Sequence, residues 1–465
     1  MIDVVIVVAY LICLLSLGLY NSKVKDYKQY SAGGKEYSAL VIFCTLTASY
    51  IGGGFTIGLS AKTFSYGILY ILAMFGFSIK EILIAKYLAP KMAPFQDTCS
   101  TTGDIMALSY GKAGKILTGI ASVIVCGGII GAQFAACGNI FYIFFDLPIT
   151  QGVILTAVII ITYVAFGGLK SVIRASIFNF IILLSVIAMI AYLGMEKIGS
   201  IDNFIALTPK ANLTPDGGLG YITFIILFLS FFFGETLVPP YTQRLLIGTS
   251  TRETQKGTLY SGLSSFFIFA MVGIIGMVAY ILNPLLEPDL AFPYIVSELL
   301  PTGLKGIGVA AMLAIIISSA DAFLNAVSIA LKKDLLEPIF GIKNTSLDYQ
   351  VALSRVITLI TGIIATIFAL STSSVLDILL YSYQFWTPFI LVPLIAAIYG
   401  IRTSKKIFWI SSVAGIATVI MWNIFSPYIS SVKGSLEGVL LGILVNCIIF
   451  TSLRFTSLNS MSPGK

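Results

Sequence analysis

Apolar runs about 20 residues long recur along the whole chain, and short polar loops separate them. A helix of that length crosses the hydrocarbon core of a bilayer. Thirteen such runs are predicted to be membrane-spanning helices, at 2–20, 38–60, 66–90, 114–140, 149–166, 175–195, 219–240, 259–282, 304–331, 352–371, 375–399, 407–427 and 437–453. Only 11% of the residues are charged, against about 25% in soluble proteins. The sequence therefore predicts an all-α polytopic membrane protein without a separate soluble domain.

The residue types present exclude several kinds of chemistry. The chain contains no histidine, which excludes histidine metal sites and histidine-based acid–base triads. Its six cysteines are scattered and show neither metal nor disulfide spacing. No nucleophile–base pair stands out either. We therefore expect that the chain is not an enzyme, needs no cofactor and has no nucleic acid or obligate protein partner beside the lipid bilayer.

Basic residues are divided unevenly between two sets of loops. The loops after the first, third, fifth, seventh, ninth and eleventh spans contain most of the lysines and arginines, whereas the opposite loops contain only Lys197, Lys210, Lys305 and Lys433. Loops rich in Lys and Arg face the cytoplasm. We therefore predict a plasma (cell inner) membrane protein with its N-terminus outside and its C-terminus cytoplasmic. The external loop 284–303 contains a short amphipathic piece over 292–300.

Three successive glycines, Gly52 to Gly54, interrupt the second apolar run. Each glycine costs about 1 kcal/mol relative to alanine inside a helix, so the triplet favours local unwinding. Unwound backbone is tolerated at membrane depth only where it is buried in protein or lines a cavity. Its free carbonyl groups suit a small cation. The alternative is that these glycines only allow two helices to pack closely.

A second interruption occurs five spans later, where Gly234-Glu235 precedes Pro239-Pro240. A proline pair cannot continue an ordinary helix. Paired broken helices at matching positions point to an inverted repeat with its binding site between them. We predict that spans two to six are repeated by spans seven to eleven. The expected division is an N-terminal helix and loop (1–37), a transport core (38–400, as repeats 38–200 and 201–400) and C-terminal helices (401–465).

Span nine carries a polar face made of Ser318, Asp321, Asn325 and Ser328. Their spacings of three, four and three residues place them on one side of a helix. A carboxylate in the middle of a membrane costs at least about 2.5 kcal/mol, so it normally faces a cavity or a partner. Hydroxyl and carboxylate oxygens suit Na⁺. The alternative is hydrogen bonding between helices, which accounts for serine and asparagine better than for the acid.

Four further polar residues lie inside apolar runs, and three of them, Lys80, Gln133 and Glu235, enter the expected solute pocket. Lys80 and Glu81 are about 100° apart around the third helix, so we expect at most one of them to face a given cavity. Glu235 lies beside the second break, and Gln133 lies in the fourth span. A cavity-facing Lys80 would favour a carboxylate-bearing substrate.

Several motifs together resemble the sodium:solute symporter family over nearly the whole chain. Residues 47–54 (TASYIGGG) look like its first broken helix, and residues 163–171 (YVAFGGLKS) resemble its signature after the fifth helix. Gln243-Arg244 matches the pair after its second broken helix, and residues 318–321 (SSAD) match its ninth helix. The resemblance implies a leucine-transporter-type core of five plus five helices, with additional helices at both ends.

The resemblance also implies a sodium site. Its ligands would be the carbonyl groups of Ala48, Ile51 and Ile315 and the hydroxyl groups of Ser318 and Ser319. Relatives often carry Thr-Asp after the Gly-Gly-Leu signature, and in some of them that aspartate helps to hold a second sodium. Here Ala175-Ser176 stands at that place. Asp321 is therefore a candidate for a second cation or a proton site, or else a structural acid paired with a neighbour.

The motifs define the substrate less closely than the fold and the sodium site. Sugar-transporting members use Gln and Glu at the positions of Phe55 and Met74, which disfavours a sugar. The motifs look most like the choline-transporter branch, whose cation cage contains tryptophans where this chain has Tyr50 and Val238. A choline-like cation and a carboxylate-bearing solute both stay open. The residues expected to line the pocket are Tyr50, Gly53, Phe55, Phe77, Lys80, Gln133 and Glu235.

These observations lead us to expect a secondary active transporter. It would carry a small organic solute with Na⁺ as the coupling ion, by alternating access. A proton-coupled transporter, an ion channel, an intramembrane enzyme and a transporter-like sensor are the alternatives. The lack of a symmetric pore repeat disfavours the channel, and the lack of a cytoplasmic signalling domain disfavours the sensor.

Overall fold

The computed structural model describes residues 2–20, 36–341, 347–371, 382, 384–401, 403–429 and 435–460, and almost all of them are helical. Within these residues no strand forms beyond an isolated bridge between Tyr37 and Gly248. Eight helices there are long and apolar enough to cross a membrane, and one bent pair makes a ninth. The prediction of an all-α polytopic protein is confirmed.

The first half of the chain contains two helices with an internal bend. Its elements are α1 (Ile2–Tyr20), α3 (Ala39–Tyr50), η1 (Gly54–Gly58), α4 (Leu59–Tyr66), α5 (Ile68–Leu83), η2 (Ile84–Leu88), η3 (Ala89–Phe95), α6 (Thr102–Phe145), α7 (Ile149–Ile198), α8 (Ile201–Leu207) and η4 (Lys210–Leu213). The bends occur at Gly111 (φ 69°) in α6 and Gly168 (φ 60°) in α7, a backbone region that glycine enters without strain. The Gly168 bend falls in the loop predicted between spans five and six.

The second half contains the other broken helix, whose two parts are α9 and α10. Its elements are α9 (Tyr221–Phe233), α10 (Pro239–Leu246), α11 (Thr251–Leu282), η5 (Pro288–Leu290), α12 (Ala291–Leu299), α13 (Leu304–Ala330), η6 (Leu331–Leu336), α14 (Glu337–Phe340), α15 (Leu347–Leu370), η7 (Thr387–Leu391), α17 (Val392–Ile398), α18 (Lys405–Ile429) and α19 (Ser435–Ser460). The amphipathic piece predicted at 292–300 forms α12. The eleventh predicted span is described only at 382 and from 384 onward.

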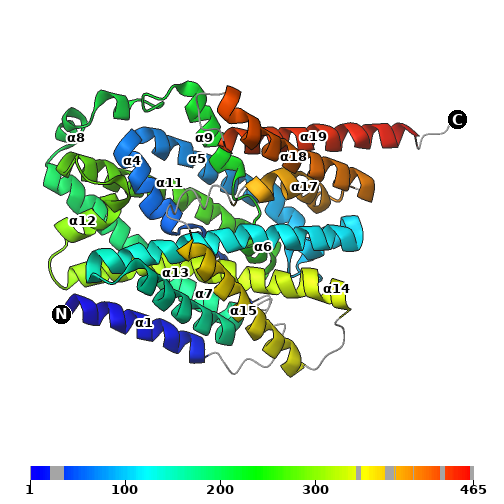
Figure 1. Ribbon diagram of the computed structural model, residues 1–465, viewed down its shortest axis with the longest axis horizontal. Helices are drawn as coiled ribbons and strands as arrows, with labels where there is room; N and C mark the ends of the chain where they lie inside the picture. Colours follow the sequence, from blue (N-terminus) through cyan, green and yellow to red (C-terminus); the bar gives the residue numbers. More distant parts are fainter. Residues whose placement is uncertain are drawn as a thin grey trace.

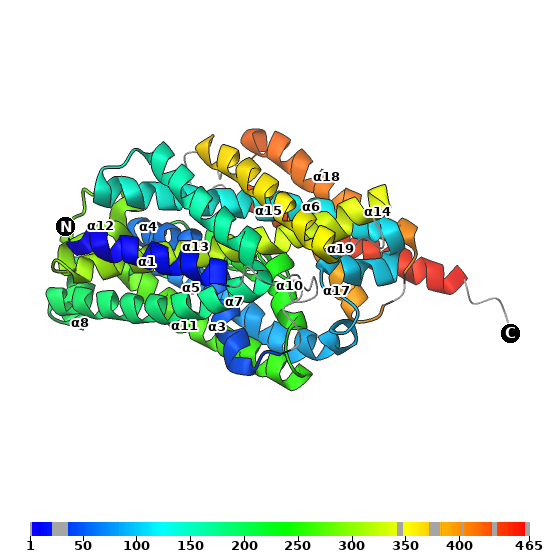
Figure 2. The ribbon, with the colours of Figure 1, turned by 90° about the horizontal axis from the view of Figure 1, so that it is seen from below.

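The central helix of the fold is α13. Of its most apolar window, 94% is buried, the largest share among the spans described. It packs against α6 and α7, and also against α1, α3 and α15, and both ribbon views show it inside the layer of surrounding helices (Figures 1 and 2). A helix enclosed on every side is apolar all round, so the few polar residues of α13 must find partners on its neighbours.

The start of α13 is fixed by the first helix of the chain. The Asp3 carboxylate of α1 accepts hydrogen bonds from the backbone N–H groups of Gly303, at 2.8 Å, and Gly306, at 2.6 Å. An acid at this place satisfies amide groups that have no partner within the helix and complements the helix dipole. Although α1 lies outside the predicted repeat, it thus anchors the helix that carries the polar face.

The two ends of the molecule carry different elements. The N-terminus, α8 and α12 lie at one end, and α14 and the C-terminus lie at the other (Figures 1 and 2). This relative placement agrees with the arrangement expected from the loop charges. Which end faces the cytoplasm, and the division into three regions at 37 and 400, remain predictions.

Candidate functional site

The first break separates α3 from η1 and α4, whose axes differ by 69°. The helix ends because Ile51 leaves helical geometry (φ −77°, ψ 88°). The Gly52 N–H, which would continue the ladder to Ala48 O, donates to Tyr50 O at 2.9 Å instead. The Ala48 carbonyl accepts a hydrogen bond from Ser318 Oγ at 3.0 Å. The break thus turns a backbone oxygen toward α13.

The glycines of this break also permit very close packing. A Cβ added at Gly52 would lie 2.8 Å from Ser319 Oγ, and one added at Gly53 would lie 2.8 Å from Ala136 Cβ. Atoms cannot approach so closely without displacement, so both positions require glycine. Unwinding and close packing, the two interpretations of the triplet, therefore both apply at this break.

The predicted sodium ligands gather around this break. Ala48 and Ser318 are in direct contact, and Ser319 lies beside Gly52, the residue after Ile51. Ile315 lies four residues before Ser319 on α13, and all five residues are at most 2% exposed. The result is a group of hydroxyl and carbonyl oxygens with no charged side chain among the five residues.

Asp321 faces a different neighbour from Ser318. One of its carboxylate oxygens accepts a hydrogen bond from the Tyr163 hydroxyl of α7, and its other oxygen has no hydrogen-bond partner among the described residues. Tyr10 and Arg244 lie within electrostatic range of this acid. The side chain is fully buried. It is therefore a buried acid with one bonded oxygen and one open oxygen.

Unsatisfied polar atoms occur on the helices around Asp321. Tyr10 of α1 donates to Asn179 Oδ1 of α7 at 3.2 Å, whereas Asn179 Nδ2 has no partner. Ser176 Oγ and Asn325 Oδ1 are also buried without a hydrogen bond. Buried polar groups are nearly always paired, so a region with several exceptions is suited to an additional ligand.

Three residues of the expected solute pocket form an aromatic cluster. The ring of Phe77 lies 4.8 Å from that of Tyr50 and 5.4 Å from that of Phe55, measured between centroids. Two rings that the sequence analysis did not include complete the cluster. Phe269 of α11 lies 5.8 Å from Phe77, and Tyr241 of α10 lies 6.2 Å from Tyr50. Phe269 carries no sequence signal, but Tyr241 directly follows the proline pair.

Lys80 and Glu81 pair with each other. Lys80 Nζ lies 3.0 Å from Glu81 Oε1, with side chains 3% and 2% exposed. Long side chains span the 100° between their Cα positions. Lys80 Nζ also lies 3.4 Å from the centre of the Phe77 ring, a favourable place for a cation. The lysine is thus part of the aromatic cluster.

The second break, from Gly234 to Val238, is held by side chains around it. Trp386 Nε1 donates to Thr236 O at 2.9 Å, and Thr242 Oγ1 donates to Leu237 O at 2.8 Å. Leu237 has a positive φ of 55°. The Glu235 carboxylate accepts a hydrogen bond from the Tyr241 hydroxyl. This pair connects the acid beside the break to the aromatic cluster.

Gln133 and Gly53 form a hydrogen bond. The Gly53 N–H donates to Gln133 Oε1 at 2.7 Å, and both residues are buried. The glutamine of α6 thus satisfies an amide that the broken helix leaves open. Its position supports the break directly, in addition to adjoining the expected pocket.

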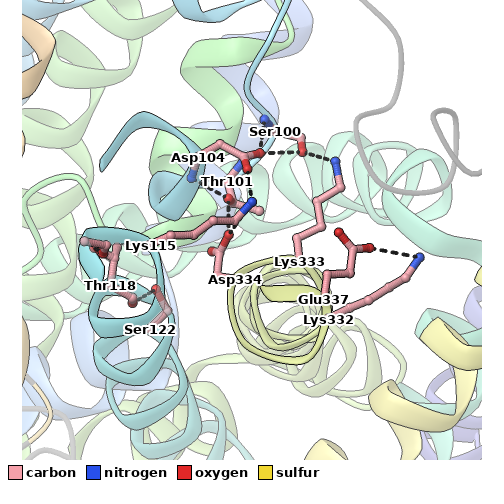
Figure 3. A network of polar contacts seen from close by, with 11 residues as sticks. Ser100, Thr101, Asp104, Lys115, Thr118, Ser122, Lys332, Lys333, Asp334 and Glu337 are labelled. Atoms are coloured by element: carbon pink, nitrogen blue, oxygen red, sulfur yellow. Dashed lines mark hydrogen bonds and ion pairs between the residues drawn. The ribbon is translucent and has the colours of Figure 1, made fainter. Parts of the chain in front are cut away.

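A separate polar network at the α14 end joins α6 to η6 (Figure 3). Lys115 Nζ lies 2.7 Å from Asp104 Oδ1, Thr101 Oγ1 donates to Asp334 Oδ1 at 2.7 Å, and Lys333 Nζ donates to Ser100 Oγ at 2.6 Å. The sequence analysis treated these lysines only as loop charges. The hydrogen bond from Thr101 to Asp334, which is fully buried and 233 residues away in the chain, carries no local sequence signal.

Comparison with known proteins gives relatives that share most of the chain. A sodium/proline symporter of Staphylococcus aureus is 24% identical over 78% of this chain and 74% of its own. A high-affinity choline transporter of Drosophila melanogaster is 23% identical over 80% of this chain and 62% of its own. A sodium/glucose cotransporter of Vibrio parahaemolyticus is 22% identical over 99% of this chain and 92% of its own.

Solved structures show the same fold. A Na⁺-coupled sialic acid symporter, in a substrate-bound outward-open state, superposes with a TM-score of 0.84 over 100% of this chain and 99% of its own, at 18% identity. A nucleobase-cation-symport-1 family transporter matches with a TM-score of 0.54 and 13% identity over 91% of this chain and 95% of its own. The leucine-transporter-type fold predicted from the motifs is therefore confirmed.

The family model for sodium:solute symporters matches residues 30–415, which include both broken helices and the polar face of α13. The chain belongs to the sodium:solute symporter family.

Proposed function

We propose that this chain binds the coupling Na⁺ at the first helix break, between α3 and α13. The ligands would be the carbonyl groups of Ala48, Ile51 and Ile315 with the hydroxyl groups of Ser318 and Ser319. The observation that carries the proposal is the Ala48 carbonyl, which is free of the helix ladder and lies 3.0 Å from Ser318 Oγ. Hard oxygen ligands of this kind suit Na⁺ better than a soft metal ion.

The class of transport follows from the family. The chain is a secondary transporter that moves a small organic solute together with Na⁺. The named solutes of the relatives are proline, choline and glucose. For this chain we propose a small organic solute held between the two breaks. Tyr50, Phe55 and Phe77 would contact its apolar part, with Lys80 and Glu235 at the edge and Gly53 and Gln133 supporting the site.

Asp321 is proposed as a second cation or proton site. Its open carboxylate oxygen and the unsatisfied atoms of Asn179, Ser176 and Asn325 support this role. The competing role, that of a structural acid, is supported by its bond with Tyr163. We also propose that the chain lies in the cell membrane with its N-terminus outside, because the loops expected to face the cytoplasm contain most of the lysines and arginines.

The sodium proposal is tested without knowing the solute. The purified full-length chain is heated in NaCl and in KCl of equal ionic strength, and its melting temperature is compared. A ligand that binds only the folded state stabilises it by RT ln(1 + L/Kd), where L is its free concentration, so the melting temperature rises with the ligand concentration once that exceeds Kd. We expect a Na⁺-specific increase that Ser318→Ala weakens. Equal melting temperatures in both salts would contradict the proposal.

A further inference from the structure

A cavity of about 270 Å³ lies between α5 and η2 on one side and α9 and the η7–α17 segment on the other. It is lined at one place by Lys80, whose side chain is only 3% exposed. Seven residues further along the same helix it is lined by Tyr87, which is 49% exposed. Two helical turns cover about 10 Å. The cavity thus connects the buried lysine with the surface of the protein.

Among the residues that the structure describes, Lys80 is the only charged one on the wall of this cavity. The other lining residues are Leu83, Ile84, Tyr87, Leu88, Phe232, Phe233, Thr236, Leu391, Ile395 and Tyr399. An ammonium group has three N–H donors. Lys80 Nζ lies 3.0 Å from Glu81 Oε1 and 3.4 Å from the centre of the Phe77 ring. Lys80 Nζ makes no hydrogen bond to any described residue, so a donor of this buried cation remains for a molecule in the cavity.

The exposed part of the cavity also lies near positive charge. Lys86 Nζ lies 5.1 Å from the centre of the Tyr87 ring, and Lys91 Nζ lies 5.9 Å from that of Tyr399. The Tyr399 hydroxyl donates to the backbone carbonyl of Tyr87 at 3.2 Å, which joins the two walls of the cavity. A cleft with one sign of charge concentrates ions of the opposite sign. Among the described residues no acid lines this cavity, so the field at its exposed part favours an anion over a cation.

Two acids lie near the inner end of the cavity without lining it. Glu81 is paired with Lys80, and Glu235, next to the lining residue Thr236, accepts a hydrogen bond from Tyr241. The inner end of the cavity is therefore formed by the Lys80 ammonium group and by Thr236 of the second break. The remaining wall is aliphatic and aromatic, which suits an apolar molecular body.

We propose that this cavity binds an organic anion that has a carboxylate group and an apolar body, with the carboxylate paired to Lys80. The inference rests on the proposed function, since it names the class of the transported solute and the route by which it reaches or leaves the pocket. It selects the carboxylate-bearing solute over the choline-like cation, because the cavity presents a cation at its inner end and two more near its exposed end.

The first test uses the purified full-length chain in NaCl. Its melting temperature is measured with the sodium salts of straight-chain carboxylates from acetate to octanoate, and with the corresponding neutral amides. We expect at least one carboxylate to stabilise the protein while its amide does not. Lys80→Met/Glu81→Gln removes both charges together, so that neither is left buried and unpaired. It should weaken the apparent affinity for that carboxylate on the order of tenfold or more, since charge-assisted hydrogen bonds are the strong ones.

The matched control is Lys62→Met in α4, a lysine that lies outside the cavity lining, which should keep the affinity for the carboxylate. Equal stabilisation by carboxylates and amides, or an unchanged affinity in the double variant, would overturn the inference. The response to NaCl alone is measured in the same samples. If the Na⁺ response is present and no carboxylate is preferred, this inference fails and the proposed sodium site stands.

A second test does not depend on the choice of solute. Ile395→Cys places a thiol on the cavity wall, in a chain whose exposed Cys13 and Cys447 are replaced with serine. The thiol is treated with an anionic sulfonatoethyl and a cationic trimethylammonioethyl methanethiosulfonate. We expect the anionic reagent to react faster relative to the cationic one, and this ratio to fall severalfold after Lys80→Met/Glu81→Gln. A ratio that does not depend on Lys80 would contradict the inference.

Discussion

Both broken helices leave backbone groups without partners in the helix, and different residues bond to these groups at the two breaks. At the first break, glycines free the backbone, and side chains from other helices take the exposed groups. Ser318 of α13 donates to Ala48 O, and Gln133 of α6 accepts from the Gly53 N–H. At the second break, prolines restart the helix, and Trp386 donates to Thr236 O while Glu235 bonds to Tyr241 within the same span.

This difference indicates which ligand each break can hold. The first break gathers neutral hydroxyl and carbonyl oxygens, which suit a small cation. The second places a carboxylate beside aromatic rings and the Lys80–Glu81 pair, which suit the functional groups of an organic solute. If this division is correct, substitutions at the first break should change the response to Na⁺. Substitutions that only loosen the second break should leave that response intact.

The largest effect is expected from Gly53→Leu. A Cβ at this position already lies 2.8 Å from Ala136 Cβ, so a leucine must displace α6 and the oxygens of the break. We expect loss of the Na⁺-dependent increase in melting temperature in protein that still reaches the membrane. The control is Gly127→Leu, because a Cβ at Gly127 has no atom within 4 Å. A normal Na⁺ response of Gly53→Leu would show that the glycine triplet serves helix packing and not the binding of Na⁺.

The next effect is that of Ser318→Ala and Ser319→Ala. Each removes one hydroxyl group with little change in volume. We expect the apparent Kd for Na⁺, obtained from the dependence of the melting temperature on Na⁺ concentration, to rise about tenfold, which corresponds to about 1.4 kcal/mol. Ser328→Ala is the matched control, since the Ser328 hydroxyl only donates to Leu324 O of its own helix. Unchanged Na⁺ dependence in both single variants would refute the site at the first break.

Asp321→Asn should have a smaller and more specific effect. The substitution keeps the shape of the side chain and removes its charge. If Asp321 holds a second cation, the Hill coefficient for Na⁺ should fall; if it carries a proton, the pH dependence of the Na⁺ response should become flatter. Tyr163→Phe serves as the comparison, because it removes the hydroxyl bonded to the acid. A loss of stability in both variants with an unaltered Na⁺ response would identify a structural acid.

The smallest effect is expected from Trp386→Phe at the second break. It removes the hydrogen bond from Nε1 to Thr236 O, whose net contribution is about 1 kcal/mol. We expect a slightly lower melting temperature and an unchanged apparent Kd for Na⁺. A change in Na⁺ affinity as large as that of Ser318→Ala would show that both breaks contribute to one site, and the proposed division would be wrong.

The sequence allowed prediction of the features that depend on local chemistry. Apolar length predicted the spans, the glycine triplet and the proline pair predicted the two breaks, and the helical spacing placed Ser318 and Asp321 on one face of span nine. Each of these depends on residues within one helical segment. The motifs then assigned the family, because four short matches in the correct order are specific when taken together.

What only the tertiary structure decided was which helices supply the partners. Ser318 turns to Ala48, whereas Asp321, three residues later, turns to Tyr163 on another helix. The pairing of Lys80 with Glu81 and the contact of Phe269 with Phe77 depend on side-chain reach and on helix packing, neither of which follows from spacing along the chain. Local sequence fixes where a helix breaks and which faces are polar. The hydrogen-bond partners of a buried group are fixed by the packing of segments that are far apart in the chain, because a buried group must find its partner wherever the fold places one.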